Sequence, residues 1–464
     1  MLMGYSEQRR LSFPKDFLWG TASSSYQCEG GNMQNQWYRW EQQGHILSGE
    51  HCGRAANWWY AAEDDFAFAE QMENNALRLS LEWSRIEPQE GVWDSAALER
   101  YREMLLDLHR RHMVPIVTLH HFTDPLWFVE RGAFTLQENV SYFVRYVEHV
   151  VAALGDLCTF WVTLNEPNNY AFQGYLFGTF PPGEQDLGRA FMVLRNLLQA
   201  HVAAFYLLRE RSPQAKIGYC LRYHLREPIH PHSMLNVSVA RIQEQLFNWS
   251  ILRAGESGRF SFPIGSLLAE IPGAVGARDY HGVNYYTRDR ARFDPRRPTA
   301  AVGRRFMRAS MPRTDPGLDE DIGEIYPYGL YRVLSSVYQR TRGNKPIYIT
   351  ENGFSDRTDR TDDHRPAAIL AHLAMVHKAI REGIPVCGYL HWSLTDNFAW
   401  NNGWSIRFGL IELDPVTQIR VPRRSASMYG EICRANAITE EIVYRYAPEI
   451  VDTIFGQIDQ SLLV

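Results

Sequence analysis

The 464-residue sequence lacks the features that mark several large classes of protein. It contains no apolar run near the ~20 residues that a membrane-spanning helix needs. Its first 17 residues include no apolar segment typical of a signal peptide. Its 48 Lys and Arg residues against 53 Asp and Glu give a net charge of −5, whereas nucleic-acid-binding proteins usually carry a basic excess. We therefore expect a cytoplasmic protein that binds neither a membrane nor nucleic acid.

Cysteine is also scarce. The six residues are scattered singly along the chain, and none forms a C-x-x-C pair. This spacing excludes zinc-ribbon and thioredoxin-like motifs, and isolated cysteines without a signal peptide are expected to be reduced thiols. Nothing in the sequence predicts a metal or a cofactor.

Aromatic residues, by contrast, are plentiful. They make up 13% of the chain and include 13 Trp, within an otherwise ordinary composition of 45% hydrophobic and 22% charged residues. A surplus of Trp favours either a large core or a site where flat ligands stack.

Short apolar runs alternate with longer amphipathic stretches. The runs are too short for helices and are typical of buried parallel strands; they cover 17–22, 76–81, 114–119, 160–164, 216–221, 279–283, 346–349 and 386–390. Helical periodicity covers 58–74, 95–112, 137–154, 187–211, 328–341 and 365–382, with Ser95 as a candidate N-cap. The alternation predicts an α/β fold: one (β/α)8 TIM barrel spanning a single domain, 1–464, with long βα-loop insertions after strands one, four, five and six.

Polar residues follow the ends of these strands, where barrel active sites form. Glu166 follows the fourth strand and Glu351 the seventh, so the two carboxylates should face each other across the barrel mouth. Paired carboxylates are the machinery of glycoside hydrolysis, in which one is protonated and the other ionised. Arg78 and Tyr286 could hold Glu351 ionised, and Asn165 could donate to a sugar hydroxyl. One such Glu alone is a weak signal; the pair is a stronger one.

Seven ordered motifs resemble glycoside hydrolase family 1, the retaining β-glucosidase family. They are FPKDFLWGTA (13–22), TLHHF (118–122), TLNEP (163–167), GVNYYT (282–287), YITENG (348–353), WSLTDNF (392–398) and RFGL (407–410).

The resemblance implies a role for each matching residue. It makes Glu166 the acid/base and Glu351 the nucleophile, with Arg78 beneath it. The residues implied to bind the sugar are Gln27, His121, Asn165, Asn284, Tyr286, Trp392 and Trp400, with Asn284 and Tyr286 also serving the nucleophile.

The sequence departs from the family pattern at Ala399, where the family carries a Glu that binds the sugar hydroxyls O4 and O6. We hypothesise that Ala399 weakens discrimination at these positions and that Asn401 or Asn402 compensates in part. The family's 6-phospho-glycosidase branch also lacks this Glu, but it carries a Lys and a Tyr where this chain has Ile406 and Phe408.

The segment 288–313 holds nine arginines. The simpler interpretation is a solvated surface loop; the alternative is a positive rim that attracts anionic ligands.

The function that the resemblance implies is that of a retaining exo-β-glycosidase. Its expected substrates are small-molecule β-glycosides such as cellobiose and aryl β-glucosides, with β-galactosides and β-fucosides alongside. The alternatives are a 6-phospho-β-glycosidase, a catalytically inactive sugar-binding relative, and an unrelated barrel enzyme. The sequence leaves the oligomeric state open, and a homo-oligomer is among the alternatives.

Overall fold

The structure is a computed structural model that describes residues 9–260, 270–296, 303–306, 324–355 and 362–456. The side chains of 303–306 lie outside this description, as do the last residues of the arginine-rich segment.

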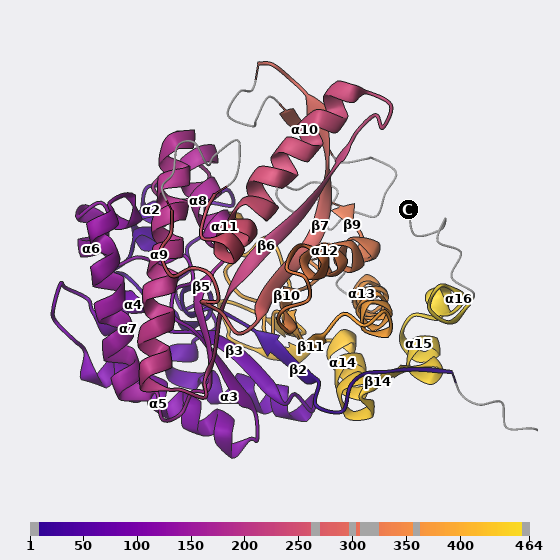
Figure 1. The fold of residues 1–464 in the computed structure, drawn as a ribbon. Helices are drawn as coiled ribbons and strands as arrows, with labels where there is room; N and C mark the ends of the chain where they lie inside the picture. The colour runs from indigo at the N-terminus through magenta and orange to yellow at the C-terminus, as the bar shows by residue number, and fades with distance from the viewer. Residues whose placement is uncertain (1–8, 261–269, 297–302, 307–323, 356–361, 457–464) are drawn as a thin grey trace, which may run out of the picture.

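Eight parallel strands form a closed barrel (Figure 1). They are β2 (Leu18–Ala22), β3 (Ala76–Ser80), β4 (Val114–Thr118), β5 (Phe160–Asn165), β6 (Lys216–Pro228), β7 (His281–Phe293), β10 (Ile347–Asn352) and β11 (Val386–Trp392). Each strand pairs with the next, β10 pairs with both β7 and β11, and β11 pairs with β2, which closes the ring. The predicted (β/α)8 barrel is confirmed.

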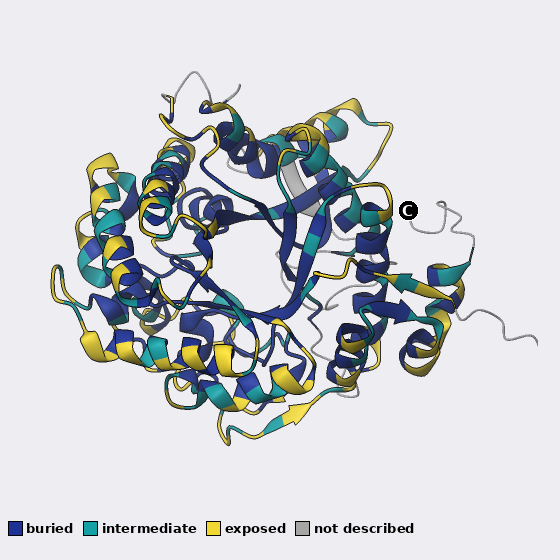
Figure 2. Ribbon diagram, turned by 60° about the horizontal axis from the view of Figure 1, so that its bottom comes forward, coloured by how far each residue is buried: buried dark blue, intermediate teal, exposed yellow. Residues whose placement is uncertain are grey.

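Helices surround the barrel. The outer ring contains α3 (Trp58–Gln71), α5 (Ser95–Arg110), α7 (Val140–Leu154), α9 (Leu187–Arg211), α11 (Ser250–Ser257), α12 (Pro327–Arg340), α13 (His364–Arg381) and α14 (Arg424–Ala435). Figure 2 shows the strands almost wholly buried, with exposed residues on the outward faces of the helices.

The insertions and the C-terminal part of the chain add shorter elements. The helices are α1 (Ser25–Glu29), α2 (Gln36–Gln42), α4 (Trp83–Ile86), α6 (Leu126–Glu130), α8 (Pro167–Phe172), α10 (Met234–Glu244), α15 (Glu440–Tyr446) and α16 (Val451–Phe455). The strands are β1 (Arg10–Ser12), β8 (Gly303–Phe306), β9 (Glu324–Ile325), β12 (Ile411–Leu413), β13 (Arg420–Pro422) and β14 (Ala437–Thr439). The long insertions follow the first, fourth, fifth and sixth barrel strands, as predicted.

One predicted N-cap is wrong by one residue. Helix α5 begins at Ser95, but its N-cap is Asp94, whose carboxylate accepts hydrogen bonds from the backbone N–H groups of Ala96 and Ala97. Asp caps as well as Ser does, so the capping rule alone does not choose between two adjacent candidates.

Inward-facing side chains fill the barrel. Ala76, Ile116, Phe160, Val162 and Tyr348 belong to one buried cluster, whose upper members are Tyr286 and Trp392. The barrel centre is therefore packed, as in other barrels of this kind, and a pocket lies above it, at the carboxyl ends of the strands.

The arginine-rich segment begins as a strand and not as a loop. β6 and β7 continue beyond the barrel as a long pair of strands beside α10 (Figure 1), and β7 pairs with β8 and β9. Arg288 is 1% exposed and contacts Glu324 and Glu227, and Arg290 also contacts Glu227. These two arginines are neutralised within the fold, so neither fits the predicted solvated loop or a positive rim.

Helix α9 is long and apolar enough, by length and composition, to cross a membrane. However, 67% of its most apolar window is buried inside the protein, where it packs on α7, α8 and β5. A core helix of a barrel meets the same criterion of length and composition.

Candidate active site

A pocket opens at the carboxyl ends of the barrel strands. Eight of the ten predicted site residues line it. The other two, Arg78 and Asn284, are fully buried directly beneath it and hold the lining residues in place.

Glu351 is the penultimate residue of β10 and is held by two donors. Arg78 Nη1 lies 2.6 Å from Glu351 Oε1, and the Tyr286 hydroxyl donates to Oε2 at 2.7 Å. Arg78 is 0% exposed, so its charge acts in a poorly solvated environment, where a nearby opposite charge favours the ionised carboxylate. Both donors were predicted from the sequence.

The orientation of the Asn165 amide follows from its neighbours. Its Oδ1 accepts from Arg78 Nη2 at 2.7 Å and from Asn284 Nδ2 at 3.1 Å, so its Nδ2 must face His121 Nε2, 3.0 Å away. Burial and the charge of Arg78 hold the pKa of His121 well below its usual value, so the ring is neutral. A neutral ring that accepts at Nε2 carries its proton at Nδ1, and the buried Nδ1 has no partner among the described residues.

Glu166 occupies a turn between β5 and α8. Pro167 is the first residue of α8, a position that suits its fixed φ and missing N–H, and Glu166 adopts a left-handed backbone with φ 45° and ψ 55°. A non-glycine residue in this region stores of order 1–3 kcal/mol of strain, which is common at functional sites. The carboxylate accepts from Asn284 Nδ2 at 2.8 Å and from Asn169 Nδ2 at 3.0 Å.

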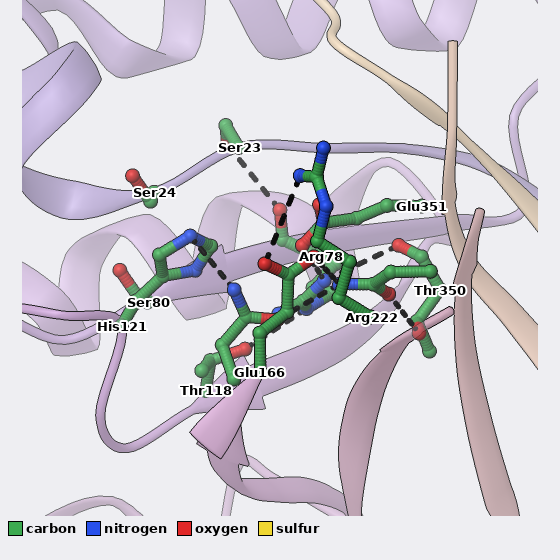
Figure 3. A network of polar contacts seen from close by, with 12 residues as sticks. Ser23, Ser24, Arg78, Ser80, Thr118, His121, Glu166, Arg222, Thr350 and Glu351 are labelled. Atoms are coloured by element: carbon green, nitrogen blue, oxygen red, sulfur yellow. Dashed lines mark hydrogen bonds and ion pairs between the residues drawn. The ribbon is translucent and has the colours of Figure 1, made fainter. Parts of the chain in front are cut away.

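The two carboxyl groups sit in different electrostatic surroundings. Burial raises the pKa of Glu166 to about 7, and the negative charge of Glu351 adds to this, while Arg222 and Asn284 oppose it. Figure 3 shows the two glutamates close to Arg78 and Arg222, and a dashed line marks the ion pair between Arg222 and Glu166. Glu166 can therefore carry a proton near neutral pH while Glu351 is paired with a cation.

Aromatic rings and Gln27 form the remaining walls. The His121 ring stacks with Trp392 and with Trp400, at centroid distances of 5.7 and 6.0 Å. Gln27 Nε2 donates to the backbone oxygen of Phe398 at 2.7 Å, which fixes it beside Trp400. Both Trp residues line the pocket, as predicted.

Ala399 lines the pocket together with Asn401 and Asn402. Asn401 is engaged in the wall, since its Oδ1 accepts from Trp40 Nε1 and its Nδ2 contacts the backbone oxygen of Thr179. Asn402 Oδ1 is buried without a partner in the described part of the chain. Of the two candidates for compensating the missing Glu, Asn402 is the one with a free polar atom.

Sequence reasoning missed three residues of this site. Thr350 donates to Asn284 Oδ1 at 2.6 Å, Asn169 bonds Glu166, and Arg222 lines the pocket from β6. Thr350 and Asn169 are close in sequence to the two glutamates, a proximity that could have identified them. Arg222 had no motif to mark it, because the predicted fifth strand ended at 221.

The aromatic series after Glu166 contributes less to the pocket than its spacing indicated. Tyr170 donates to Asp124, and Phe172 and Tyr175 are buried in the core. Phe180 is the member that lines the pocket.

A TIM barrel with two carboxylates, polar donors and aromatic walls at its mouth is the architecture of a glycosidase. Comparison with known proteins agrees. The chain matches the family described as glycosyl hydrolase family 1 over residues 9–438, and it belongs to this family.

Relatives in this family carry two kinds of name. The chain is 32% identical to the 6-phospho-beta-galactosidase of Streptococcus equi subsp. zooepidemicus and 30% identical to beta-glucosidase A of Thermotoga maritima; each alignment covers 92% of this chain and 99% of the relative. Among solved structures, it resembles a beta-glycosidase from Pyrococcus horikoshii with a TM-score of 0.84 at 36% identity, covering 94% of this chain and 98% of that one. A Thermotoga maritima beta-glucosidase in complex with deoxynojirimycin has a TM-score of 0.84 at 29% identity, with 92% and 99% covered.

Proposed function

We propose that this glycosidase is a retaining exo-β-glycosidase that removes terminal β-D-glucosyl residues from small β-glycosides, with β-galactosyl and β-fucosyl residues as further substrates. The observation that carries the proposal is the contrast between the two carboxyl groups. Glu351 is ion-paired with Arg78 at 2.6 Å, whereas burial raises the pKa of Glu166 to about 7.

The roles follow from this contrast. Glu351, ionised, attacks the anomeric carbon and forms a covalent glycosyl–enzyme intermediate as the aglycone leaves. Glu166, protonated, gives its proton to the departing glycosidic oxygen and then, as a carboxylate, takes a proton from the water that releases the sugar. Tyr286 and Arg78 hold the nucleophile in position until it attacks.

The other lining residues would bind the glycosyl unit. The Nδ1–H of His121, which has no partner among the described residues, is suited to a sugar hydroxyl, and Asn165 is held beside it. Trp392 and Trp400 supply the flat apolar surfaces on which sugar faces stack. Gln27, fixed beside Trp400, adds an amide at the same wall.

A 6-phospho-β-glycosidase remains the second candidate, because a relative of that name is 32% identical. The pocket favours the unphosphorylated substrate. Ile406 and Phe408 line it with apolar surface, and Arg222 is the one cationic side chain among the described lining residues.

Hydrolysis of a panel of 4-nitrophenyl glycosides tests the proposal. The panel holds the β-glucoside, β-galactoside, β-fucoside and β-glucoside 6-phosphate, and the wild type is compared with Glu351→Ala. We expect the wild type to cleave the unphosphorylated glycosides and the variant to lose at least about a thousandfold in kcat. Cleavage of the phosphorylated sugar alone would replace the proposal with the second candidate, and binding without cleavage would favour an inactive sugar-binding protein.

A further inference from the structure

Arg222 is a cation in the pocket wall to which the proposed reaction assigns no contact with the substrate. It lies on β6, in register with Asn284 on β7, and its side chain is 22% exposed. Its guanidinium carbon lies 5.2 Å from the centre of the Tyr286 ring, so the group is supported on an aromatic face. Its backbone is fixed as well, since its N–H and oxygen both bond the Asn168 side chain.

The guanidinium has unused hydrogen-bonding capacity. Its one ion pair within the described residues is a contact of 4.0 Å with Glu166 Oε2, too long for a hydrogen bond, and its N–H groups donate to none of those residues (Figure 3). An arginine has five N–H donors in a planar fork that matches a carboxylate. Partial exposure leaves this fork accessible from the pocket.

The position of Arg222 indicates which part of a substrate it meets. Gln27, Ala399 and Trp400, which would surround the outer hydroxyls of the sugar, follow β2 and β11, and β2 lies opposite β6 in the barrel. Glu166, the proposed proton donor, must face the glycosidic oxygen, and Arg222 is next to it. Arg222 therefore lies on the leaving-group side of the pocket, away from O6 of the sugar.

We propose that Arg222 is a specificity-determining residue that binds a carboxylate on the aglycone, close to the glycosidic oxygen, and so favours β-glycosides of hydroxy acids. This inference rests on the proposed function, since it assigns the leaving-group side from Glu166. A carboxylate fits better than a phosphate dianion here, because the second negative charge of the dianion would add to the repulsion from Glu351, which is ionised in the proposed reaction.

The test compares two substrates of nearly the same shape, one with a negatively charged group and one with a neutral group at the same position. They are 2-carboxyphenyl β-D-glucoside and its neutral counterpart 2-carbamoylphenyl β-D-glucoside, assayed by chromatography about one pH unit below the pKa of Glu166. The ratio of kcat/KM for the acid over the amide is measured for the wild type, Arg222→Gln and Arg222→Lys. The different intrinsic reactivities of the two leaving groups contribute the same factor to the ratio of every enzyme, so they cancel when the ratios of two enzymes are compared.

We expect the ratio to fall at least about tenfold in Arg222→Gln, mainly through a higher KM for the acid, and to be largely retained in Arg222→Lys, which keeps the charge. The matched control Arg110→Gln, on the exposed side of α5, should keep the wild-type ratio.

A ratio that stays within about twofold of wild type in Arg222→Gln overturns the inference. Failure to cleave either glucoside, while 4-nitrophenyl β-D-glucoside is cleaved, also overturns it and leaves the proposed function intact. If the nitrophenyl glucoside is not cleaved, the proposed function fails and the inference fails with it. The lysine variant and the amide substrate distinguish a lost charge from a misfolded pocket, because misfolding lowers both rates together.

Discussion

At the scale of single residues, the proposed chemistry requires two carboxyl groups to differ in their affinity for a proton. Glu166 and Glu351 are both buried, at 2% and 4% exposed. Glu351 has a guanidinium and a phenol as partners, whereas Glu166 has two amides and only a distant guanidinium. Amide donors compensate less for the lost hydration of a carboxylate than a cation does, so the proton stays on Glu166.

This difference predicts the pH dependence of activity. The pKa of Glu166 is raised to about 7, and the protonated form is the one that assists the leaving group, so kcat/KM should fall as the pH rises through about 7. Arg222 stabilises the carboxylate form, so Arg222→Gln should raise the pKa of Glu166 and move this fall to higher pH.

Initial rates at substrate concentrations far below KM, measured across the pH range, check both statements. If kcat/KM falls at the same pH in Arg222→Gln as in the wild type, the assigned electrostatic coupling between Arg222 and Glu166 is contradicted. If kcat/KM of the variant falls at a lower pH, the sign of this coupling is contradicted.

A second prediction at this scale concerns Ala399. Introducing the missing carboxylate by Ala399→Glu should add a charge-assisted hydrogen bond to O4 and O6, worth about 1.5–3 kcal/mol. The preference for β-glucoside over β-fucoside, which lacks O6, should then rise roughly tenfold or more.

The measurement is kcat/KM for 4-nitrophenyl β-glucoside, β-galactoside and β-fucoside with both enzymes. Unchanged preferences would show that position 399 does not contact these hydroxyls. Asn402→Ala serves as the companion variant, since Asn402 also lines the pocket and its Oδ1 has no partner in the part of the chain that the structure describes.

At the scale of elements, the site depends on how closely the strand ends approach one another. Gly353 follows β10, and a Cβ added there would lie 1.9 Å from the backbone oxygen of Trp392, at the end of β11. Such a contact is impossible without moving one of the two strand ends. These ends carry Glu351 and Trp392, so glycine at 353 allows them to share one pocket.

Gly353→Ala should therefore damage activity more than stability. Overpacking typically costs about 1–3 kcal/mol, whereas a shift of about 1 Å in a catalytic group can lower the rate about a hundredfold. Thermal unfolding and kcat are compared with those of Gly188→Ala in α9, outside the pocket lining, where the nearest atom to the added Cβ is Asp186 Oδ1 at 3.3 Å. Equal activity in the two variants would contradict this account of the strand ends.

At the scale of the whole molecule, the alternation of buried strands with amphipathic helices made the barrel predictable, because each β/α unit repeats the same pattern. Several candidate site residues could be proposed from the pattern because strand ends in a barrel converge on one face, whereas Gln27 and Trp400 were proposed from the family resemblance; eight of the ten candidates line the pocket. Thr350 and Asn169 are near the two glutamates in the sequence, but their partners Asn284 and Glu166 were shown by the structure.

Two other features could not be derived from the sequence pattern. The continuation of β6 and β7 beyond the barrel depends on the pairing of these two strands with each other and of β7 with β8 and β9, and the arginines of β7 are polar enough to resemble a loop. Arg222 lies on this unpredicted part of β6. Its importance comes from its neighbours across the barrel mouth and not from those along the chain.

The compact barrel also predicts the reactivity of its thiols. The six cysteines are unpaired, five are buried, and Cys387 is partly exposed. A thiol-specific reagent should therefore modify at most one cysteine rapidly in the native protein and all six after unfolding in guanidinium chloride. Rapid modification of several thiols in the native protein would show that the barrel opens readily in solution.

The central claim is the assignment of the two carboxyl groups, and azide rescue tests it most directly. Glu351→Ala and Glu166→Ala are each incubated with 2,4-dinitrophenyl β-D-glucoside and sodium azide, and the anomeric configuration of the glucosyl azide is determined by NMR. This leaving group departs without a proton donor, so loss of the acid does not block the first step.

The account predicts α-glucosyl azide from Glu351→Ala, because azide attacks from the face that the nucleophile has vacated. It predicts β-glucosyl azide from Glu166→Ala, because azide there attacks the glycosyl–enzyme intermediate on Glu351. The reverse pairing of variants and products would exchange the two roles. The same anomer from both variants would contradict the double-displacement mechanism.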